Sequence, residues 1–305
     1  MHTSPSPQLL PPEDLAHIQN TVIQWYSHNA REIIWRTPAT SAWGILVSEV
    51  MSQQTPVARV EPLWQAWMHR WPEPRDLAHA PTADILKAWD RLGYPRRALR
   101  LKECATVIAH EYGNEVPSDL GSLLSLPGIG TYTAAAVAAF AFGQRVPVLD
   151  TNVRRVLSRL IYARYLNPKS STSKRELREL EDLLPASDAP QFSVGLMELG
   201  ALVCKTIPAC DRCPLTGLCA WQRAGCPEPS TQEREIARHR VQKFSGTDRE
   251  VRGKIMAVLR HAEHPVSAMD LATIWPDSEQ YTRALEGLIR DKLAQESNGF
   301  FHLPH

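Results

Sequence analysis

Two short segments of the 305-residue chain combine residue types that can bind an anion and hold a negative charge beside it. The run LPGIGT at 126–131 predicts a tight turn that opens a helix, because Gly128 and Gly130 permit backbone conformations closed to other residues. Free N–H groups at the start of such a helix bind phosphate oxygens. The run VLDTN at 148–152 ends an apolar stretch in Asp150, where a second helix should begin. The pair indicates a protein that binds a phosphate backbone beside a carboxylate, and ordinary helix capping is the alternative.

Four cysteines share one short loop, with the spacing Cys204-x5-Cys210-x2-Cys213-x5-Cys219. Four thiolates suit either tetrahedral zinc or a four-iron cluster. Zinc sites usually pair two C-x2-C knuckles, whereas this loop contains only one. The spacing therefore favours an iron–sulfur cluster and leaves zinc or unmetallated thiols as alternatives. Cys104 lies on an apolar helical face, which is typical of a buried structural thiol.

The charge balance, with 34 basic and 33 acidic residues, does not by itself indicate a nucleic-acid partner. Five basic residues between 91 and 102, and four arginines around Asp150, form clusters that either contact phosphates or lie on solvated helix faces. No apolar run is long enough to cross a bilayer, and residues 1–13 lack a signal-peptide pattern. We therefore expect a cytoplasmic protein, associated with the nucleoid if it is bacterial. The four arginines are Arg145, Arg154, Arg155 and Arg159.

The elements that must position these residues are helical, because apolar residues recur at helical spacing through most of the first 220 positions. We expect a disordered tail at 1–12, a main domain at 13–224 that contains the cysteine loop 204–219, and a polar linker at 225–246. Residues 247–305 predict three helices and then a hairpin at Asn298-Gly299, which fits a small winged-helix-like unit. A plain three-helix cap is the alternative.

Together these pieces resemble the helix–hairpin–helix DNA glycosylases of the endonuclease III superfamily, and within it the MutY-type adenine DNA glycosylases. The resemblance covers about residues 18–222 and includes the runs WGILVSEVMSQQT at 43–55, LGY at 92–94 and MELGA at 197–201. It implies an all-α, two-lobed fold, with a six-helix barrel at roughly 35–145 and DNA lying between the lobes. The second lobe would combine the N-terminal helix with residues 150–222 and hold a [4Fe–4S] cluster on Cys204, Cys210, Cys213 and Cys219. We expect a monomer that binds duplex DNA and no membrane.

Two carboxylates suit the chemistry of purine release, which needs a proton for the base and negative charge beside a cationic sugar. Glu49 lies in an otherwise apolar helix, where burial raises a carboxyl pKa and suits it to general acid catalysis. Asp150 at a helix N-terminus is favoured in its ionised form. Alone, the two could equally be an exposed helix carboxylate and an N-cap. The resemblance implies that Glu49 protonates adenine N7 and helps to activate water, and that Asp150 stabilises the sugar cation.

The identity of the residue at position 132 distinguishes two reaction types. Relatives with lyase activity carry a lysine two residues after the second hairpin glycine, where it forms a Schiff base with the sugar. This chain has Tyr132 there and no lysine between Gly128 and Asn152, so the amine nucleophile is absent from the expected place. The sequence predicts a monofunctional glycosylase in which Tyr132 and Asn152 position the sugar or water. An endonuclease III-like glycosylase and AP lyase, or a non-catalytic DNA-binding module, are the alternatives.

The resemblance also assigns base and DNA contacts, although the aromatic residues could simply pack in the core. The expected adenine pocket is Trp35, Arg36 and Glu198, and the expected DNA contacts are Gln54, Thr55, Tyr94, Pro127, Gly128, Gly130 and Thr131. Base release requires the adenine to be flipped out of the stack, and Gln54 and Tyr94 match positions that wedge into the duplex near the opposite base.

Three features depart from the family pattern. The first cysteine spacing is x5 instead of x6, and Val194 occupies a position where some members carry a glutamine near the base. Residues 247–305 are too short and too helical for the Nudix-like domain that reads 8-oxoguanine in many members. Recognition of adenine opposite 8-oxoguanine or guanine then depends on Gln54, Thr55 and Tyr94 or on the tail, where we expect Arg283 and Arg290 to contact DNA.

Overall fold

The computed structural model describes residues 10–165, 172–231, 233–235 and 244–305. Most of the predicted N-terminal tail, and part of the predicted linker, lie outside these residues. The helical fold predicted from periodicity is confirmed. The chain divides into two compact units, one formed by Met1–Glu32 with Ala134–Val241 and the other by Ile33–Thr133 with Gln242–His305. No helix among the described residues is both long and apolar enough to cross a membrane.

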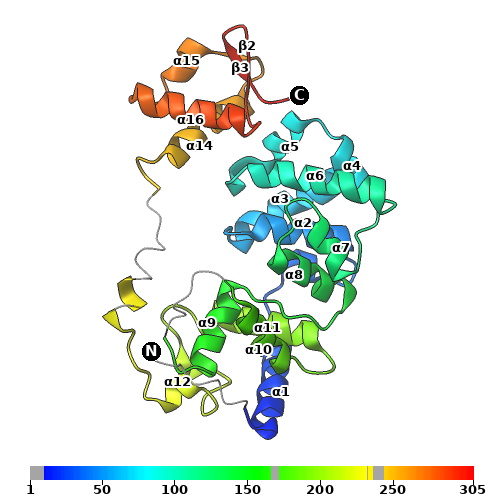
Figure 1. Ribbon diagram of the computed structural model, residues 1–305, viewed down its shortest axis with the longest axis vertical. Helices are drawn as coiled ribbons and strands as arrows, with labels where there is room; N and C mark the ends of the chain where they lie inside the picture. The colour runs from blue at the N-terminus through cyan, green and yellow to red at the C-terminus, as the bar shows by residue number, and fades with distance from the viewer. Residues whose placement is uncertain (1–9, 166–171, 232, 236–243) are drawn as a thin grey trace. The chain divides into compact units, whose positions relative to one another are not determined.

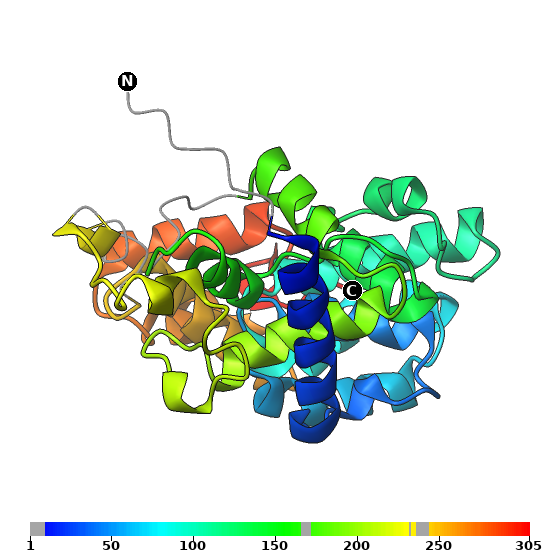
Figure 2. The same cartoon turned by 90° about the horizontal axis from the view of Figure 1, so that it is seen from below.

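The first unit is built around the central helix α11. Helix α11 packs against both α1 and α9, and Figures 1 and 2 show α1 lying beside it. Gly195 of α11 allows this close approach, because a Cβ there would stand 2.8 Å from Cγ1 of Val22. The core is made of aliphatic and aromatic side chains such as Ile18, Val153 and Phe192. The helices of this unit are α1 (Pro12–Asn29), α9 (Thr151–Leu160), α10 (Lys174–Leu183), α11 (Ala189–Leu202), the 3-10 turn η3 (Cys210–Arg212) and α12 (Ala220–Arg223).

The second unit contains a helical lobe whose core is rich in tryptophan. The Trp67 ring makes edge contacts with Trp71 and Trp89, at centroid distances of 4.8 and 5.5 Å. The buried indole N–H groups of Trp43, Trp67 and Trp89 each donate to a backbone carbonyl, as in the 3.0 Å hydrogen bond from Trp67 to Ala88. The elements are η1 (Ile34–Arg36), α2 (Ala42–Ser52), α3 (Val57–Arg70), α4 (Pro74–His79), α5 (Thr82–Trp89), η2 (Asp90–Leu92), α6 (Arg96–Glu111) and α7 (Leu120–Ser125). Helix α8 (Thr131–Phe142) begins in this unit and continues into the first.

The C-terminal part of the second unit forms three helices and a small sheet (Figure 1). Its elements are α14 (Asp248–His261), β1 (Val266–Ser267), α15 (Ala268–Ala272), α16 (Ser278–Arg290), β2 (Gln295–Ser297) and β3 (Phe300–His302). The strand order is β1-β3-β2 with antiparallel pairing, and Phe301 pairs with both Val266 and Glu296. Asn298 and Gly299 both adopt positive φ, which the two central positions of this tight hairpin turn require. This is the winged-helix-like arrangement predicted from the sequence.

Candidate active site

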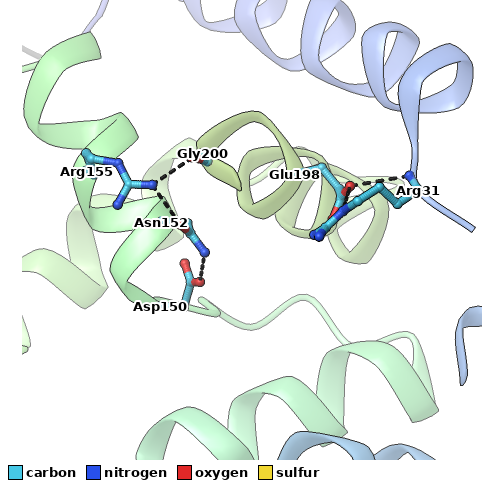
Figure 3. A network of polar contacts seen from close by, with 6 residues as sticks. All are labelled: Arg31, Asp150, Asn152, Arg155, Glu198 and Gly200. Carbon is cyan, nitrogen blue, oxygen red and sulfur yellow. Dashed lines mark hydrogen bonds and ion pairs between the residues drawn. The ribbon is translucent and has the colours of Figure 1, made fainter. Parts of the chain in front are cut away.

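Asp150 is held rigidly at the start of α9 (Figure 3). Its Oδ1 accepts a 2.6 Å hydrogen bond from the backbone N–H of Val153, and its Oδ2 accepts one of 2.8 Å from the Asn152 side chain. Both carboxylate oxygens are therefore engaged, and the position of the negative charge is fixed before any substrate binds. Such a preorganised charge stabilises a developing cation without costly rearrangement.

The pKa of Asp150 lies above the ordinary aspartate value, because burial disfavours the charged form. The hydrogen bonds from Val153 and Asn152 and the positive charge of Arg155 act in the opposite direction but are weaker. The sequence predicts an ionised Asp150 because a helix N-terminus favours the charged form. Burial outweighs that effect, and burial depends on tertiary packing. A poorly solvated carboxylate interacts more strongly with a nearby cation than a solvated one does.

Arg155 ties this aspartate to the rest of the unit (Figure 3). Its Nη2 donates to Asn152 Oδ1 and to the Gly200 carbonyl, both at 2.7 Å, and its Nε donates to the Cys204 carbonyl at 2.7 Å. Asn152 in turn donates to Asp150. The Arg155 guanidinium thus connects the Cys204 carbonyl with the Asn152 amide, which in turn orients Asp150.

Two other arginines flanking Asp150, Arg154 and Arg159, also serve the protein interior, which corrects their interpretation as phosphate contacts or a solvated face, whereas Arg145 is exposed. Arg159 is 1% exposed, donates to the carbonyls of Lys205 and Thr206 at 2.6 and 3.0 Å, and lies 3.3 Å from the Cys204 sulfur. Arg154 forms a largely buried ion pair at 2.9 Å, and Arg145 donates to three carbonyls near the end of α10. Backbone carbonyls or, for Arg154, a carboxylate of the protein therefore pair with these guanidinium groups.

The Gly200→Ala variant is expected to be less stable and less active than the wild type. A Cβ at Gly200 would stand 2.7 Å from the Asn152 Cβ and 2.9 Å from its carbonyl oxygen, so α11 would push against the start of α9. Overpacking of this kind costs about 1–3 kcal/mol, equivalent to a fall in Tm of roughly 2–10 °C. The control is Gly253→Ala, where a Cβ meets nothing within 4 Å and the helix should gain slightly. Equal melting temperatures for the two variants would contradict the close approach.

Glu198 of α11 is completely buried and forms a two-pronged ion pair with Arg31. Arg31 Nη2 donates to Oε1 at 2.6 Å and Nε to Oε2 at 2.9 Å (Figure 3). Sequence motifs point to Glu198 but not to Arg31, which lies 167 positions away and carries no local signal. The pairing keeps the buried carboxylate charged and fixes both of its oxygens.

Four further candidates lie in the second unit. Glu49 is half-buried on α2, a helix most of whose residues are buried, as its apolar sequence predicted. Trp35 is buried and packs against Trp64 at 5.8 Å, and Arg36 is half-buried beside it in η1. Tyr132 is half-buried in the first turn of α8. Glu49, Trp35, Arg36 and Tyr132 belong to the second unit, whereas Asp150, Asn152 and Glu198 belong to the first.

The hairpin between α7 and α8 exposes the residues expected to contact a phosphate backbone. Gly128 has a φ of +77°, and a Cβ there would stand 2.7 Å from the Arg100 Cβ, so only glycine fits. Pro127 is half-buried and Gly128, Gly130 and Thr131 are exposed. A cleft of about 170 Å³ beside the hairpin is lined by Arg96, Arg97 and Arg100 together with Pro127 and Gly128. Exposed backbone next to guanidinium groups suits a polyanion.

The residues expected to contact DNA near the opposite base differ in their accessibility. Gln54 and Tyr94 both adopt left-handed backbone conformations, at φ values of +57° and +46°. The Tyr94 side chain is 45% exposed, as a residue that stacks on DNA must be. Thr55 is instead buried, and its hydroxyl donates to the Leu92 carbonyl at 3.2 Å. Thr55 therefore ties the end of α2 to the turn that precedes Tyr94.

Cys219 belongs to the first unit's core, and the other three loop cysteines, Cys204, Cys210 and Cys213, pack against that core. Burial, with a smaller contribution from the charges of the other three thiols, raises the pKa of Cys213 to about 11. The Arg159 guanidinium beside Cys204 supplies a positive charge that can balance thiolates. Among the described residues, no three His, Cys, Asp or Glu side chains form a ready-made group for a metal ion. Four thiols are nevertheless the donor set that iron–sulfur clusters use.

Comparison with known proteins identifies the family to which the chain belongs. Residues 47–185 match the model of the HhH-GPD superfamily of base excision DNA repair proteins. The adenine DNA glycosylase of Mycobacterium tuberculosis is 48% identical over 99% of this chain and 98% of its own length, and that of Mycolicibacterium smegmatis is 50% identical over 90% and 92%. The chain belongs to the adenine DNA glycosylase family. The human adenine DNA glycosylase is 37% identical, over 68% of this chain and 39% of its own length.

Solved structures agree on the fold. A thermostable thymine-DNA glycosylase matches 70% of this chain with a TM-score of 0.63 at 27% identity, covering 98% of that protein. An endonuclease III in a non-covalent complex with DNA matches 71% of this chain with a TM-score of 0.61 at 23% identity, covering 99% of that protein. The predicted membership of the helix–hairpin–helix glycosylases is therefore confirmed.

Proposed function

We propose that this chain is a monofunctional adenine DNA glycosylase, which hydrolyses the N-glycosidic bond of adenine opposite 8-oxoguanine or guanine in duplex DNA. The observation that carries the proposal is the carboxylate of Asp150, fixed through both oxygens at a helix start. It stands in a chain about half identical, along nearly its whole length, to proteins named adenine DNA glycosylase. The exposed hairpin and its arginine-lined cleft support a DNA substrate.

In the proposed reaction, Glu49 donates a proton to N7 of adenine. The bond between C1′ and N9 then breaks, and its electron pair leaves with the base. The positive charge that develops on the sugar is stabilised by the carboxylate of Asp150, which Asn152 and the N–H of Val153 hold in place. Water attacks C1′ and passes a proton to the Glu49 carboxylate, which restores the acid.

The absence of a lysine near the hairpin supports hydrolysis as the only activity. Attack by water leaves the sugar intact as an abasic site, whereas strand cleavage by a lyase begins with attack by an amine. Tyr132 occupies the position where that amine would stand. We assign Tyr132 to positioning the sugar or water, together with Asn152.

The adenine pocket is proposed to involve Trp35, Arg36 and Glu198. Glu198 accepts from Arg31 through both oxygens, so it contributes a fixed negative charge. Gln54 and Tyr94 are proposed to enter the duplex near the opposite base, and the hairpin residues to bind the backbone. The buried hydroxyl of Thr55 supports a role in shaping that surface instead of contacting DNA.

The four loop cysteines are proposed to hold a [4Fe–4S] cluster. The cluster would cross-link the loop 204–219 and supply a redox-active centre when bound. Arg159 and Arg155 would keep the loop in register, since both donate hydrogen bonds to its backbone carbonyls. Cys204 is the ligand whose spacing departs from the family pattern.

The proposal is tested by base release from duplexes that carry adenine opposite 8-oxoguanine, guanine, cytosine or thymine. We expect release from the first two, and loss of release in the Glu49→Gln variant by about 10²- to 10⁴-fold, the usual contribution of general acid catalysis. Borohydride should trap no covalent adduct with DNA. A trapped adduct would favour a glycosylase and lyase, and specific binding without release would favour a DNA-binding module.

A further inference from the structure

The side chain of Tyr94 is held in place by the backbone of its turn. Tyr94 lies between η2 and α6, directly after Gly93, and both residues have positive φ values. A left-handed conformation at a bulky residue is unfavourable and persists only where the surroundings enforce it. Such a turn projects the partly exposed ring in one direction.

Two arginines also hold the Tyr94 ring in place, one three residues away and the other in the C-terminal part of the chain. Arg97 lies with its guanidinium 5.9 Å from the Tyr94 ring centroid and is itself anchored by hydrogen bonds to carbonyls, including that of Gln53 at 2.6 Å. Arg249 of α14 donates from Nη1 to the Tyr94 hydroxyl oxygen at 2.8 Å, and its guanidinium also lies 5.9 Å from the ring. Phe244 lies 5.2 Å from the same Arg249 guanidinium.

The contact of Arg249 belongs to a wider attachment of the C-terminal helices within the second unit. Helix α14 packs against α5, which directly precedes the turn that carries Tyr94. Arg96 at the start of α6 pairs with Asp291 after α16 at 3.3 Å, and Arg252 of α14 pairs with the same carboxylate. The position of Arg249 is therefore set by packing as well as by its own hydrogen bond.

We infer that Arg249 is a positioning residue for Tyr94, through which residues 244–305 take part in discriminating the base opposite the target adenine. The inference rests on the proposed function, which places Tyr94 beside that base. Because the Tyr94 oxygen accepts from Arg249, its own proton points away from Arg249 and is available to an acceptor on DNA. An oxidised purine offers a carbonyl oxygen at C8 where guanine has C–H. An ordered hydroxyl donor therefore favours 8-oxoguanine.

The two tail arginines expected to contact DNA, Arg283 and Arg290, lie on α16. Arg283 is bound through two nitrogens to Asp248, at 2.8 and 2.9 Å. Arg290 is exposed at the end of α16. Arg249, which the sequence analysis did not single out, is the arginine of α14 that reaches Tyr94.

The test compares the full-length wild type with Arg249→Gln, Tyr94→Phe and the double variant. The measured quantity is the ratio of kcat/KM for adenine opposite 8-oxoguanine to that for adenine opposite guanine. Loss of one hydrogen bond worth about 1 kcal/mol should lower this ratio roughly 5-fold in each single variant. The double variant should fall no further than either single, because both changes break the same contact. Arg249→Lys, which keeps one donor, should recover part of the ratio.

Lys254→Gln is the matched control, since it removes the same charge from the same helix and its side chain faces Trp275 and Glu250 instead of Tyr94. Its ratio should equal that of the wild type. An unchanged ratio in Arg249→Gln, or an equal fall in Lys254→Gln, would overturn the inference. The same discrimination is measured in binding, as the ratio of the Kd values for duplexes that carry a tetrahydrofuran abasic analogue opposite 8-oxoguanine or opposite guanine. These duplexes test the role of Arg249 even if adenine is not released, an outcome that would count against the proposed function alone.

Discussion

The Asp150→Asn variant is expected to lose adenine release almost completely while it remains folded. The amide keeps an oxygen that can accept from the N–H of Val153, and asparagine caps helices as well as aspartate does. The substitution removes the one full negative charge that α9 places at its start. Loss of such preorganised charge should lower the single-turnover rate by about 10³-fold.

The measurement is base release from a duplex with adenine opposite 8-oxoguanine, with the enzyme in excess, alongside thermal unfolding. The new amide faces the Asn152 amide and loses that hydrogen bond, so we expect a stability cost of about 1 kcal/mol. Asp277→Asn makes the same chemical change at the start of α16, where Asp277 accepts from the N–H of Gln280 at 3.0 Å, and should release adenine normally. Wild-type release by Asp150→Asn would remove this carboxylate from the mechanism.

The Arg155→Met variant should have the largest combined effect on stability and activity. Methionine fills a similar length but donates nothing, so the oxygens of Asn152, Gly200 and Cys204 lose their partner. Leaving buried acceptors without their charged donor costs about 3–5 kcal/mol. For a chain of this size we expect Tm to fall by roughly 6–15 °C. Activity per folded molecule should also fall, because Asn152 is no longer held against Asp150.

The pH dependence of the rate separates a positioning role of Arg155 from a purely structural one. The positive charge of Arg155 lowers the pKa of Asp150, so its removal raises that pKa further. The ionised carboxylate is the active form, and a higher pKa means that it is protonated at a higher pH. The acid limb of the single-turnover rate should therefore move to higher pH in Arg155→Met.

Arg154→Met provides the comparison for this pH shift. Arg154 is the neighbouring residue on α9, and its largely buried ion pair is with Glu176. Its loss should also lower Tm but leave the acid limb unchanged. If both variants shift the limb equally, the connection from Arg155 through Asn152 to Asp150 has no special role.

Features that depend on a few consecutive residues were predictable from the sequence. Asp150 caps a helix because its side chain reaches the N–H three residues ahead, and this relation is visible in the sequence. Gly128 shapes the hairpin and Asn298-Gly299 the final turn because few residues tolerate positive φ. The buried face of each helix followed from helical spacing, and the replacement of a lysine by Tyr132 decided which reaction type to expect.

The surroundings of these residues depend on how distant segments pack in the folded chain. Arg31 meets Glu198 across 167 positions, Arg249 meets Tyr94 across 155, and Arg155 joins α9 to the Cys204 carbonyl. In the sequence, an arginine that binds DNA looks the same as one that binds backbone carbonyls, so the cluster around Asp150 could not be interpreted. The direction of the Asp150 pKa is undetermined for the same reason, because burial arises from packing between distant segments, whereas helix capping is local.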